Sequence, residues 1–118
     1  MLIHVLDRTR VLDSLIASLR PGGWIVAEEF DAESVLPDPS VGVSAVPLKT
    51  GIAMRRLMTD GGYDVRVGRS LSDRFLARGL VDVRAEGTIS IWRGGSPGSA
   101  LQRANDEQLA EAMMQVAT

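Results

Sequence analysis

The chain has 118 residues, the size of one domain, and its 13 basic and 15 acidic side chains give a formal net charge of −2. That balance excludes the strongly basic surface of a protein that binds nucleic acid or an anionic membrane. The sequence has no cysteine and one histidine, so we expect no disulfide, no cysteine nucleophile and no metal site. No apolar run reaches the roughly 18 to 20 residues that span a bilayer, and no leader-type segment opens the chain. We therefore expect a cytoplasmic protein with no membrane partner.

The first predicted element is a helix over residues 7–19. Its apolar residues recur at the i, i+3, i+4, i+7 spacing of one helical face, namely Leu12, Leu15, Ile16 and Leu19. Asp7 or Thr9 can cap its start. The Arg-Pro-Gly-Gly turn at 20–23 ends it, because proline disfavours helical geometry in the residue before it. The Trp-Ile-Val-Ala run at 24–27 is then typical of a strand buried on both faces of a parallel sheet.

After that strand the pattern becomes irregular. Residues 32–47 hold three prolines and no clear period, which predicts a loop or lid. Apolar spacing predicts a helix over residues 48–60, stopped by the glycine pair 61–62. A further helix is expected to begin at Ser70 or Ser72.

Gly79 is the expected stop of that helix. Residues 80–85 and 88–92 each alternate with period two, so they form either one long strand with a bulge or the two strands of a hairpin. Residues 93–98 are turn-forming, and Asn105 opens a last predicted helix with a capping box. Helices that alternate with apolar strands predict an α/β fold.

Residues 1–31 carry a resemblance that the elements alone do not. The run Leu-Arg-Pro-Gly-Gly-Trp at 19–24, between a helix and an apolar strand, is similar to the turn that leads into the fifth strand of class I S-adenosylmethionine-dependent methyltransferases. The Gly-Leu-Val-Asp-Val run at 79–83 resembles that family's entry into its sixth strand. The Arg-Gly-Gly-Ser-Pro run at 93–97 is similar to the segment after that strand in some members.

The resemblance implies a partial Rossmann-like sheet, the C-terminal half of a doubly wound fold. The family's glycine-rich cofactor turn and the acidic residue after its second strand would precede residue 1, and no sequence follows Thr118 for its seventh strand. A buried strand without neighbours leaves backbone groups unpaired and invites pairing with another chain. We therefore expect residues 1–118 to form one partial domain. It would be completed by residues 88–92 folding back as a surrogate strand, by self-association or strand exchange, as in a homodimer or other homo-oligomer, or by a chain that supplies the missing N-terminal half.

The candidate site residues are His4 and the acidic residues that follow the predicted strand at 24–27. Glu28, Glu29 and Asp31 come directly after the strand at 24–27, where ligands bind in open α/β folds, and are candidates for substrate binding. By the resemblance, His4 would lie near the cofactor. His4, Glu28 and Glu29 are the candidate catalytic residues, and the alternative interpretations are a structural histidine and a solvated strand end.

Two further features have two interpretations each. Trp24 and Trp92 could stack on a flat ligand, but as members of apolar strands they are expected in the core. Two arginine pairs, Arg55 with Arg56 and Arg66 with Arg69, could meet a carboxylate or a phosphate, or simply be solvated.

Two functions remain open from the sequence. The chain is either an S-adenosylmethionine-dependent methyltransferase-related protein, which transfers a methyl group to a small molecule only when another chain completes it, or a non-catalytic module that associates with itself or a partner. In both cases the isolated chain is expected to be inactive.

Overall fold

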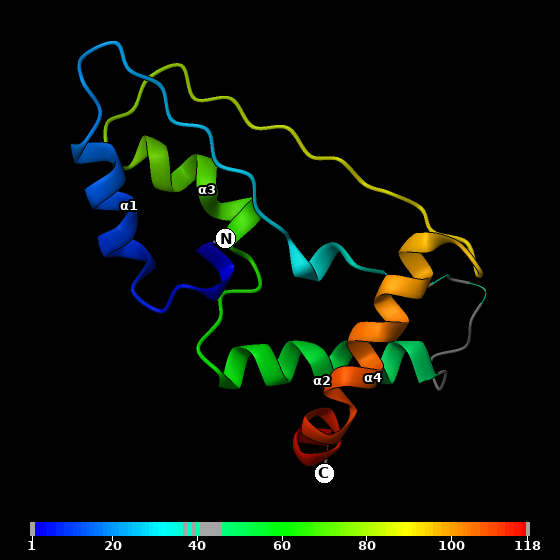
Figure 1. The fold of residues 1–118 in the computed structure, drawn as a ribbon. Coiled ribbons are helices and arrows are strands. Elements are labelled where there is room, and N and C mark those ends of the chain that lie inside the picture. The colour runs from blue at the N-terminus through cyan, green and yellow to red at the C-terminus, as the bar shows by residue number, and fades with distance from the viewer. Residues whose placement is uncertain (1, 37, 39, 41–45, 118) are drawn as a thin grey trace. The chain divides into compact units, whose positions relative to one another are not determined.

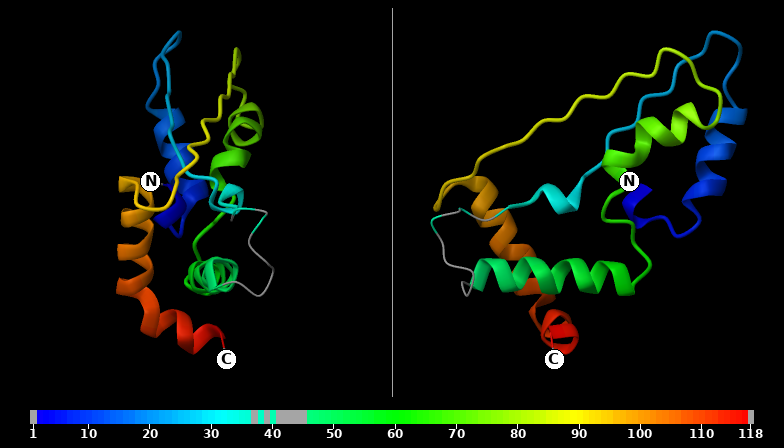
Figure 2. Two further views of the ribbon diagram at one scale, coloured as in Figure 1. Left: turned by 90° about the vertical axis from the view of Figure 1, so that its right-hand side faces the viewer. Right: turned by 180° about the vertical axis from the view of Figure 1, so that it is seen from behind.

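The computed structural model describes residues 2–36, 38, 40 and 46–117, and all regular secondary structure in this part of the chain is helical (Figure 1). Two short 3₁₀ helices and four α-helices follow one another in the order η1 (Leu2–His4), α1 (Arg8–Ala17), η2 (Ala32–Ser34), α2 (Val46–Asp60), α3 (Val67–Leu76) and α4 (Pro97–Ala117). Long stretches without helix connect α1 to η2 and α3 to α4, and they remain extended in the further views of Figure 2.

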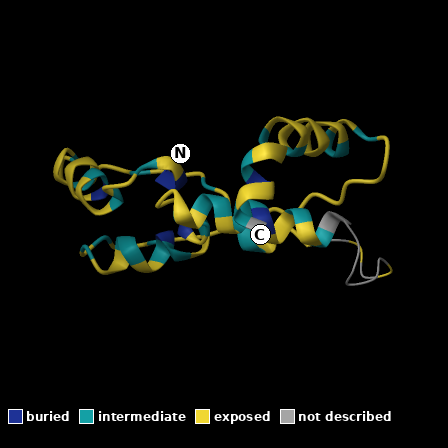
Figure 3. Ribbon diagram, turned by 90° about the horizontal axis from the view of Figure 1, so that it is seen from below, coloured by how far each residue is buried: buried dark blue, intermediate teal, exposed yellow. Residues whose placement is uncertain are grey.

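The chain forms two compact units. The first consists of Met1–Val35 with Met58–Ala85, and the second of Leu36–Leu57 with Glu86–Thr118. The core of the first unit is a small cluster of buried residues from η1, α1 and α3: Leu2, Ile3, Leu12, Val67 and Leu71. In the second unit Ala53 of α2 and Met113 of α4 are buried. Figure 3 shows how few positions of either unit are withdrawn from solvent.

The ends of three helices are as predicted. Asp7 caps α1, because its side chain accepts a hydrogen bond from the backbone N–H of Arg10 at 3.2 Å. Gly62 has a φ of 80° and ends α2, and Gly79 has a φ of 79° and ends α3. The N–H of each glycine and of the residue after it bond back into the last helical turn, which is the Schellman arrangement that a residue at positive φ allows.

Two helix starts differ from the prediction. Helix α3 begins at Val67, before the serines expected to cap it. Helix α4 begins at Pro97 and not at Asn105. Ser96 accepts the N–H of Ser99 at 3.3 Å, so Ser96-Pro97 is an N-cap followed by proline in the first helical position. Because residues 93–98 have a turn-forming composition, the sequence analysis assigns them to a turn and misses this helix start.

The predicted α/β fold is wrong, and with it the partial Rossmann-like sheet. Within residues 2–36 and 46–117 the structure contains no strand, and the runs at 24–27, 80–85 and 88–92 lie in extended chain instead. The physical reason is that strand propensity reflects packing against neighbouring strands, so a run with strand composition does not form a sheet when no neighbour is hydrogen-bonded to it.

The side chains of these extended runs lie in solvent, where the sequence predicts burial. Trp24 is 80% exposed, Val26 91% and Ile91 90%. The expectation that Trp24 lies in the core is therefore wrong, and Trp92 is also more exposed than buried. Part of the predicted loop or lid at 32–47 falls outside the described residues, and η2 occupies its first three positions.

Helices α1 and α3 of the first unit are joined by an ion pair at the surface of the core. Arg78, just after α3, donates from Nε to Oδ1 of Asp13 in α1 at 2.6 Å. Arg8 at the start of α1 donates to the carbonyl oxygen of Gly62 at 3.1 Å and lies 3.8 Å from Asp64, which Arg74 of α3 contacts at 2.6 Å. These contacts fix the turn between α2 and α3 against α1.

Candidate functional site

The predicted carboxylates belong to one stretch of the first unit, residues 28–33, which runs from the extended chain into η2. Glu28 is exposed, and no hydrogen bond or ion pair of its side chain is found in the described part of the chain. Glu29 is partly buried and accepts the backbone N–H of Leu2. The structure thereby brings residue 29 next to η1, the element that carries His4.

Asp31 is held by Arg69 of α3. Nε and Nη2 of Arg69 donate to Oδ2 of Asp31 at 2.8 and 2.6 Å, and the hydroxyl of Ser34 donates to the same oxygen at 2.6 Å. The hydrogen bond from Arg69, more than any other contact, holds the pKa of the Asp31 carboxyl below its ordinary value. Asp31 is therefore an anion at neutral pH whose Oδ2 is engaged by protein donors.

Glu33 adds a second carboxylate beside the Asp31–Arg69 pair, and the sequence analysis did not single it out. Its carboxylate lies 2.8 Å from Nε of Arg66 and 3.8 Å from Nη1 of Arg69. Arg66 and Arg69, for which the sequence left a carboxylate or phosphate and plain solvation both open, pair here with carboxylates of the chain itself. Sequence spacing gave no signal for these pairs, because Arg66 and Arg69 meet the carboxylates only when the stretch at 28–33 packs against the start of α3.

Backbone contacts dock the carboxylate stretch onto α3. The N–H of Ala32 donates to the carbonyl of Val65 at 2.9 Å, and the N–H of Gly68 donates to the carbonyl of Phe30 at 3.2 Å. A Cβ added at Gly68 would lie only 2.6 Å from that carbonyl oxygen, so the approach needs a glycine. Arg69 is thereby placed beside Asp31.

His4 does not contact the carboxylates. It is exposed at the end of η1, and its ring meets the ring of Tyr63 edge-on, with centroids 5.3 Å apart and an interplanar angle of 81°. The contact with Tyr63 accounts for the position of the His4 ring without a catalytic role. The assignments of His4, Glu28, Glu29 and Asp31 to catalysis and binding stay predictions.

An open groove of about 400 Å³ lies beside the Pro-Gly-Gly turn that carries the resemblance. It is lined by the end of α1, the turn and the segment that follows α3, namely Ile16, Leu19, Arg20, Pro21, Gly22, Gly23, Gly79, Leu80 and Val81. S-adenosylmethionine carries an ammonium group and a ribose diol, which need acceptor side chains, and this lining holds no carboxylate. The residues present do not fit the cofactor.

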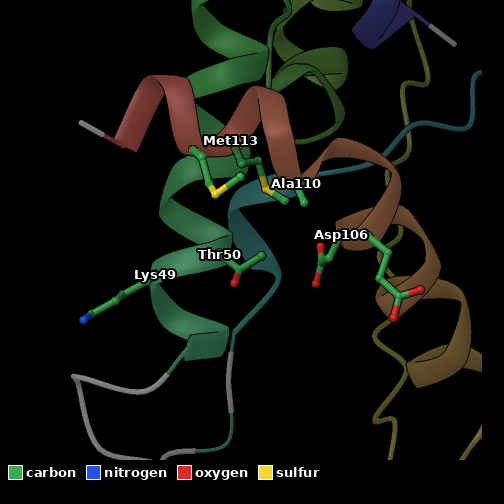
Figure 4. Close-up of a pocket in the computed structure, with 7 residues that line it drawn as sticks. Lys49, Thr50, Asp106, Ala110 and Met113 are labelled. Carbon is green, nitrogen blue, oxygen red and sulfur yellow. The ribbon is translucent and has the colours of Figure 1, made fainter.

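The second unit has a groove of its own, of about 360 Å³, between α2 and α4. Figure 4 shows Met113 and Ala110 of α4 and Thr50 of α2 at the same space, whereas the amino group of Lys49 points away. Its two carboxylates are already engaged, since Asp106 accepts from Gln102 at 2.9 Å and Glu107 from Arg103 at 2.7 Å. The groove is mainly apolar and presents no convergent polar groups for catalysis.

Among the described residues no three histidine or acidic side chains gather in a way that could hold a metal ion. No helix in the same part of the chain has both the length and the apolar character needed to cross a bilayer.

Comparison of the chain with models of known protein families, with curated proteins and with solved structures found no match.

Proposed function

We propose that this chain is a methyltransferase-related segment that becomes functional only in association with another polypeptide. The observation that carries the proposal is a pair of extended stretches with large exposed apolar side chains, residues 24–28 and 83–92. Their large side chains lie in solvent, and within the described chain their backbone N–H and C=O groups have no hydrogen-bond partner in the protein.

The energetics of such stretches favour association. Trp24, Val26, Ile89 and Ile91 are each at least 80% exposed. Burying an isoleucine or valine side chain contributes about 1.5 to 3 kcal/mol relative to leaving it in water. A run that also has free N–H and C=O groups is a template for strand addition from another chain.

The methyltransferase part of the proposal rests on the resemblance of the sequence around the turn. Helix α1, the turn with Gly22 at a φ of 75° and an apolar extended run succeed one another in the order that the resemblance implies. A methyltransferase places a nucleophile of its substrate in line with the methyl donor and works largely by proximity. Because this chain by itself does not fit the donor, the completing polypeptide would have to contribute the donor's binding groups.

The alternative is a non-catalytic module that associates with itself or a partner. One observation favours it: Asp31 and Glu33 are paired with Arg69 and Arg66, and Glu29 is bonded to the Leu2 amide, so that of these acidic residues only Glu28 is without a contact in the described structure. The predicted cytoplasmic location is part of the proposal in either form.

The test combines light scattering with calorimetry. Light scattering over a concentration series shows whether the chain associates, and S-adenosylmethionine is then titrated into the purified chain by calorimetry. We expect association, and no binding tighter than about 1 mM by the lone chain, which is roughly −4 kcal/mol.

The outcomes distinguish a methyltransferase completed by another chain from a non-catalytic module. A monodisperse monomer with cooperative thermal unfolding and measurable donor binding would overturn the need for a second chain. Association without donor binding in the associated form would leave the non-catalytic module as the function. Donor binding that appears only together with association would support the methyltransferase form.

A further inference from the structure

Residues 29–34, which we name the strap, lie against the start of α3 within the first unit. Two backbone hydrogen bonds join the strap to this helix end. The N–H of Ala32 donates to the carbonyl of Val65, and the N–H of Gly68 donates to the carbonyl of Phe30. One bond therefore runs in each direction between the strap and the start of α3.

Ion pairs at the surface also hold the strap. Arg69 contacts Asp31 at 2.6 Å, and Arg66 contacts Glu33 at 2.8 Å. The side chain of Arg66 is 65% exposed and that of Arg69 49%, so water reaches both pairs. Ion pairs in contact with water contribute little to stability and are screened by salt.

Little apolar surface fixes the strap to the core. Ala32 packs against the buried cluster of the first unit, whereas Phe30 is 77% exposed and Val35, just after the strap, is 68% exposed. Glu29 adds a polar contact, because it accepts the N–H of Leu2 in η1. Since burial of large apolar side chains is the main stabilising term in folding, a segment that buries mainly an alanine is weakly held.

The chain before the strap leaves it free to move away from α3. Residues 24–28 have no backbone hydrogen-bond partner within the described chain, and α1 ends well before them at Ala17. Helix α3 keeps its own internal hydrogen bonds when the strap is lifted. Opening of the strap therefore requires neither helix to unwind.

We infer that the strap is a lid that opens as a unit while α1 and α3 stay folded. In the closed state it occupies the side chains of Arg66 and Arg69 and covers the part of the apolar cluster on which Ala32 packs. Opening frees both arginines and uncovers that part of the cluster. The inference goes beyond the proposed function and does not depend on it, because each of these contacts lies within the first unit.

Two backbone amides report directly on the closed state. Gly68 is in the first turn of α3, where an N–H has no acceptor within the helix, so its hydrogen bond to the carbonyl of Phe30 comes from the strap. The N–H of Ala32 is bonded in the opposite direction, from the strap to Val65. Leu71, buried in the middle of α3, reports on the helix itself.

The test is amide hydrogen exchange of the full chain, followed by NMR in urea concentrations below the unfolding transition. We expect Ala32 and Gly68 to share one protection factor, at least about tenfold below that of Leu71. Low urea should leave the protection of these two amides unchanged, because a local opening exposes little surface, and should lower that of Leu71.

A variant and a change of salt test the ion pairs. Asp31→Asn should lower the protection of Gly68 by about three- to tenfold, and a rise from about 0.05 to about 0.5 M salt should act in the same direction. Glu28→Gln lies outside the strap and removes a carboxylate without a found contact, so it should leave Gly68 unchanged. If Asp31→Asn has no more effect than Glu28→Gln, the ion pairs do not hold the lid and the inference is wrong.

Three results of the exchange experiment would overturn the inference in the wild-type chain. Protection of Gly68 equal to that of Leu71, with the same dependence on urea, would mean that the strap opens only when the protein unfolds. Clearly different protection factors at Ala32 and Gly68 would mean that it does not move as a unit. Absence of protection at both amides would mean that the strap is not closed in solution. Light scattering of the same sample records association separately, so failure of the proposed function is distinguishable from failure of the lid.

Discussion

Arg69 donates two hydrogen bonds to a single oxygen of Asp31, although the two residues are 38 positions apart in the sequence. The pairing occupies one of the carboxylates that the sequence suggested for substrate binding. A ligand that uses Oδ2 of Asp31 would have to displace Arg69 first.

This pairing predicts an acid-sensitive contribution to stability. The pKa of the Asp31 carboxyl is lowered in the folded chain below its ordinary value of 3.8, first by the hydrogen bond from Arg69. A lowered pKa stabilises the fold fully above the ordinary value, and the contribution is lost as the pH falls through the folded pKa. Asp31→Asn should therefore lower the urea midpoint at pH 7, and the difference from wild type should shrink as the pH falls below 3.8. Glu28→Gln, which removes an exposed carboxylate without a found contact, is the matched control. Equal effects of the two variants at pH 7 would contradict the role of the pair.

The close approach of α3 to the extended chain makes Gly68 a sensitive position. A Cβ there would lie 2.6 Å from the carbonyl oxygen of Phe30 and 2.8 Å from its carbon, and both are backbone atoms that cannot rotate away. We expect Gly68→Ala to lower the free energy of unfolding by about 1 to 3 kcal/mol, as overpacking does elsewhere. The measurement is urea denaturation followed by circular dichroism at the helical minimum.

Gly51 provides the control for that variant. It lies inside α2 with nothing within 4 Å of an added Cβ, so Gly51→Ala should stabilise the protein by about 0.5 to 1 kcal/mol through the unfolded chain. A neutral or stabilising result for Gly68→Ala would mean that the docking of Phe30 onto α3 does not contribute to stability.

Trp92 rests directly on the first turn of α4. A Cβ at Gly98 would overlap the Trp92 ring, closest to its Cδ2 atom, and the ring must then move. In a Trp24→Phe background, where Trp92 is the one remaining tryptophan, Gly98→Ala should shift the fluorescence emission to longer wavelength because the ring loses its apolar support. Gly94→Ala adds a methyl group that meets nothing within 4 Å and should leave the emission unchanged. An unshifted spectrum in Gly98→Ala would contradict the contact.

Leu12 is the centre of the first unit's core, with no exposed surface. Leu12→Ala leaves a cavity as well as losing apolar burial, so we expect it to cost about 2 to 5 kcal/mol. Leu15 on the same helix is 45% exposed, and Leu15→Ala should cost far less. Both are read from chemical denaturation, and similar losses in the two variants would show that the small cluster is not the main source of stability.

Most helix positions and several helix ends could be predicted from the sequence. The cap at Asp7 and the stops at Gly62 and Gly79 depend on hydrogen bonds and backbone angles within a few residues, which local sequence sets. The start of α4 at Pro97 was predictable in principle from the same kind of signal, because Ser96-Pro97 is a favoured helix start.

The candidate site was predictable only in part. That Glu28, Glu29 and Asp31 come after an apolar run is visible in the sequence, but their partners are not. Asp31 meets Arg69, and Glu29 meets the amide of Leu2, across separations of 38 and 27 residues. Such pairs depend on how α3 and η1 pack, which neither spacing nor composition contains.

By itself, then, the sequence determined that helices form and where α2 and α3 stop, because a helix satisfies its own backbone and these stops are set by adjacent glycines. Only the tertiary structure decided that the runs at 24–27 and 88–92 are solvated extended chain and not strands. A strand takes its hydrogen bonds from a neighbour, and whether that neighbour is present is a property of the assembled molecule and not of the run.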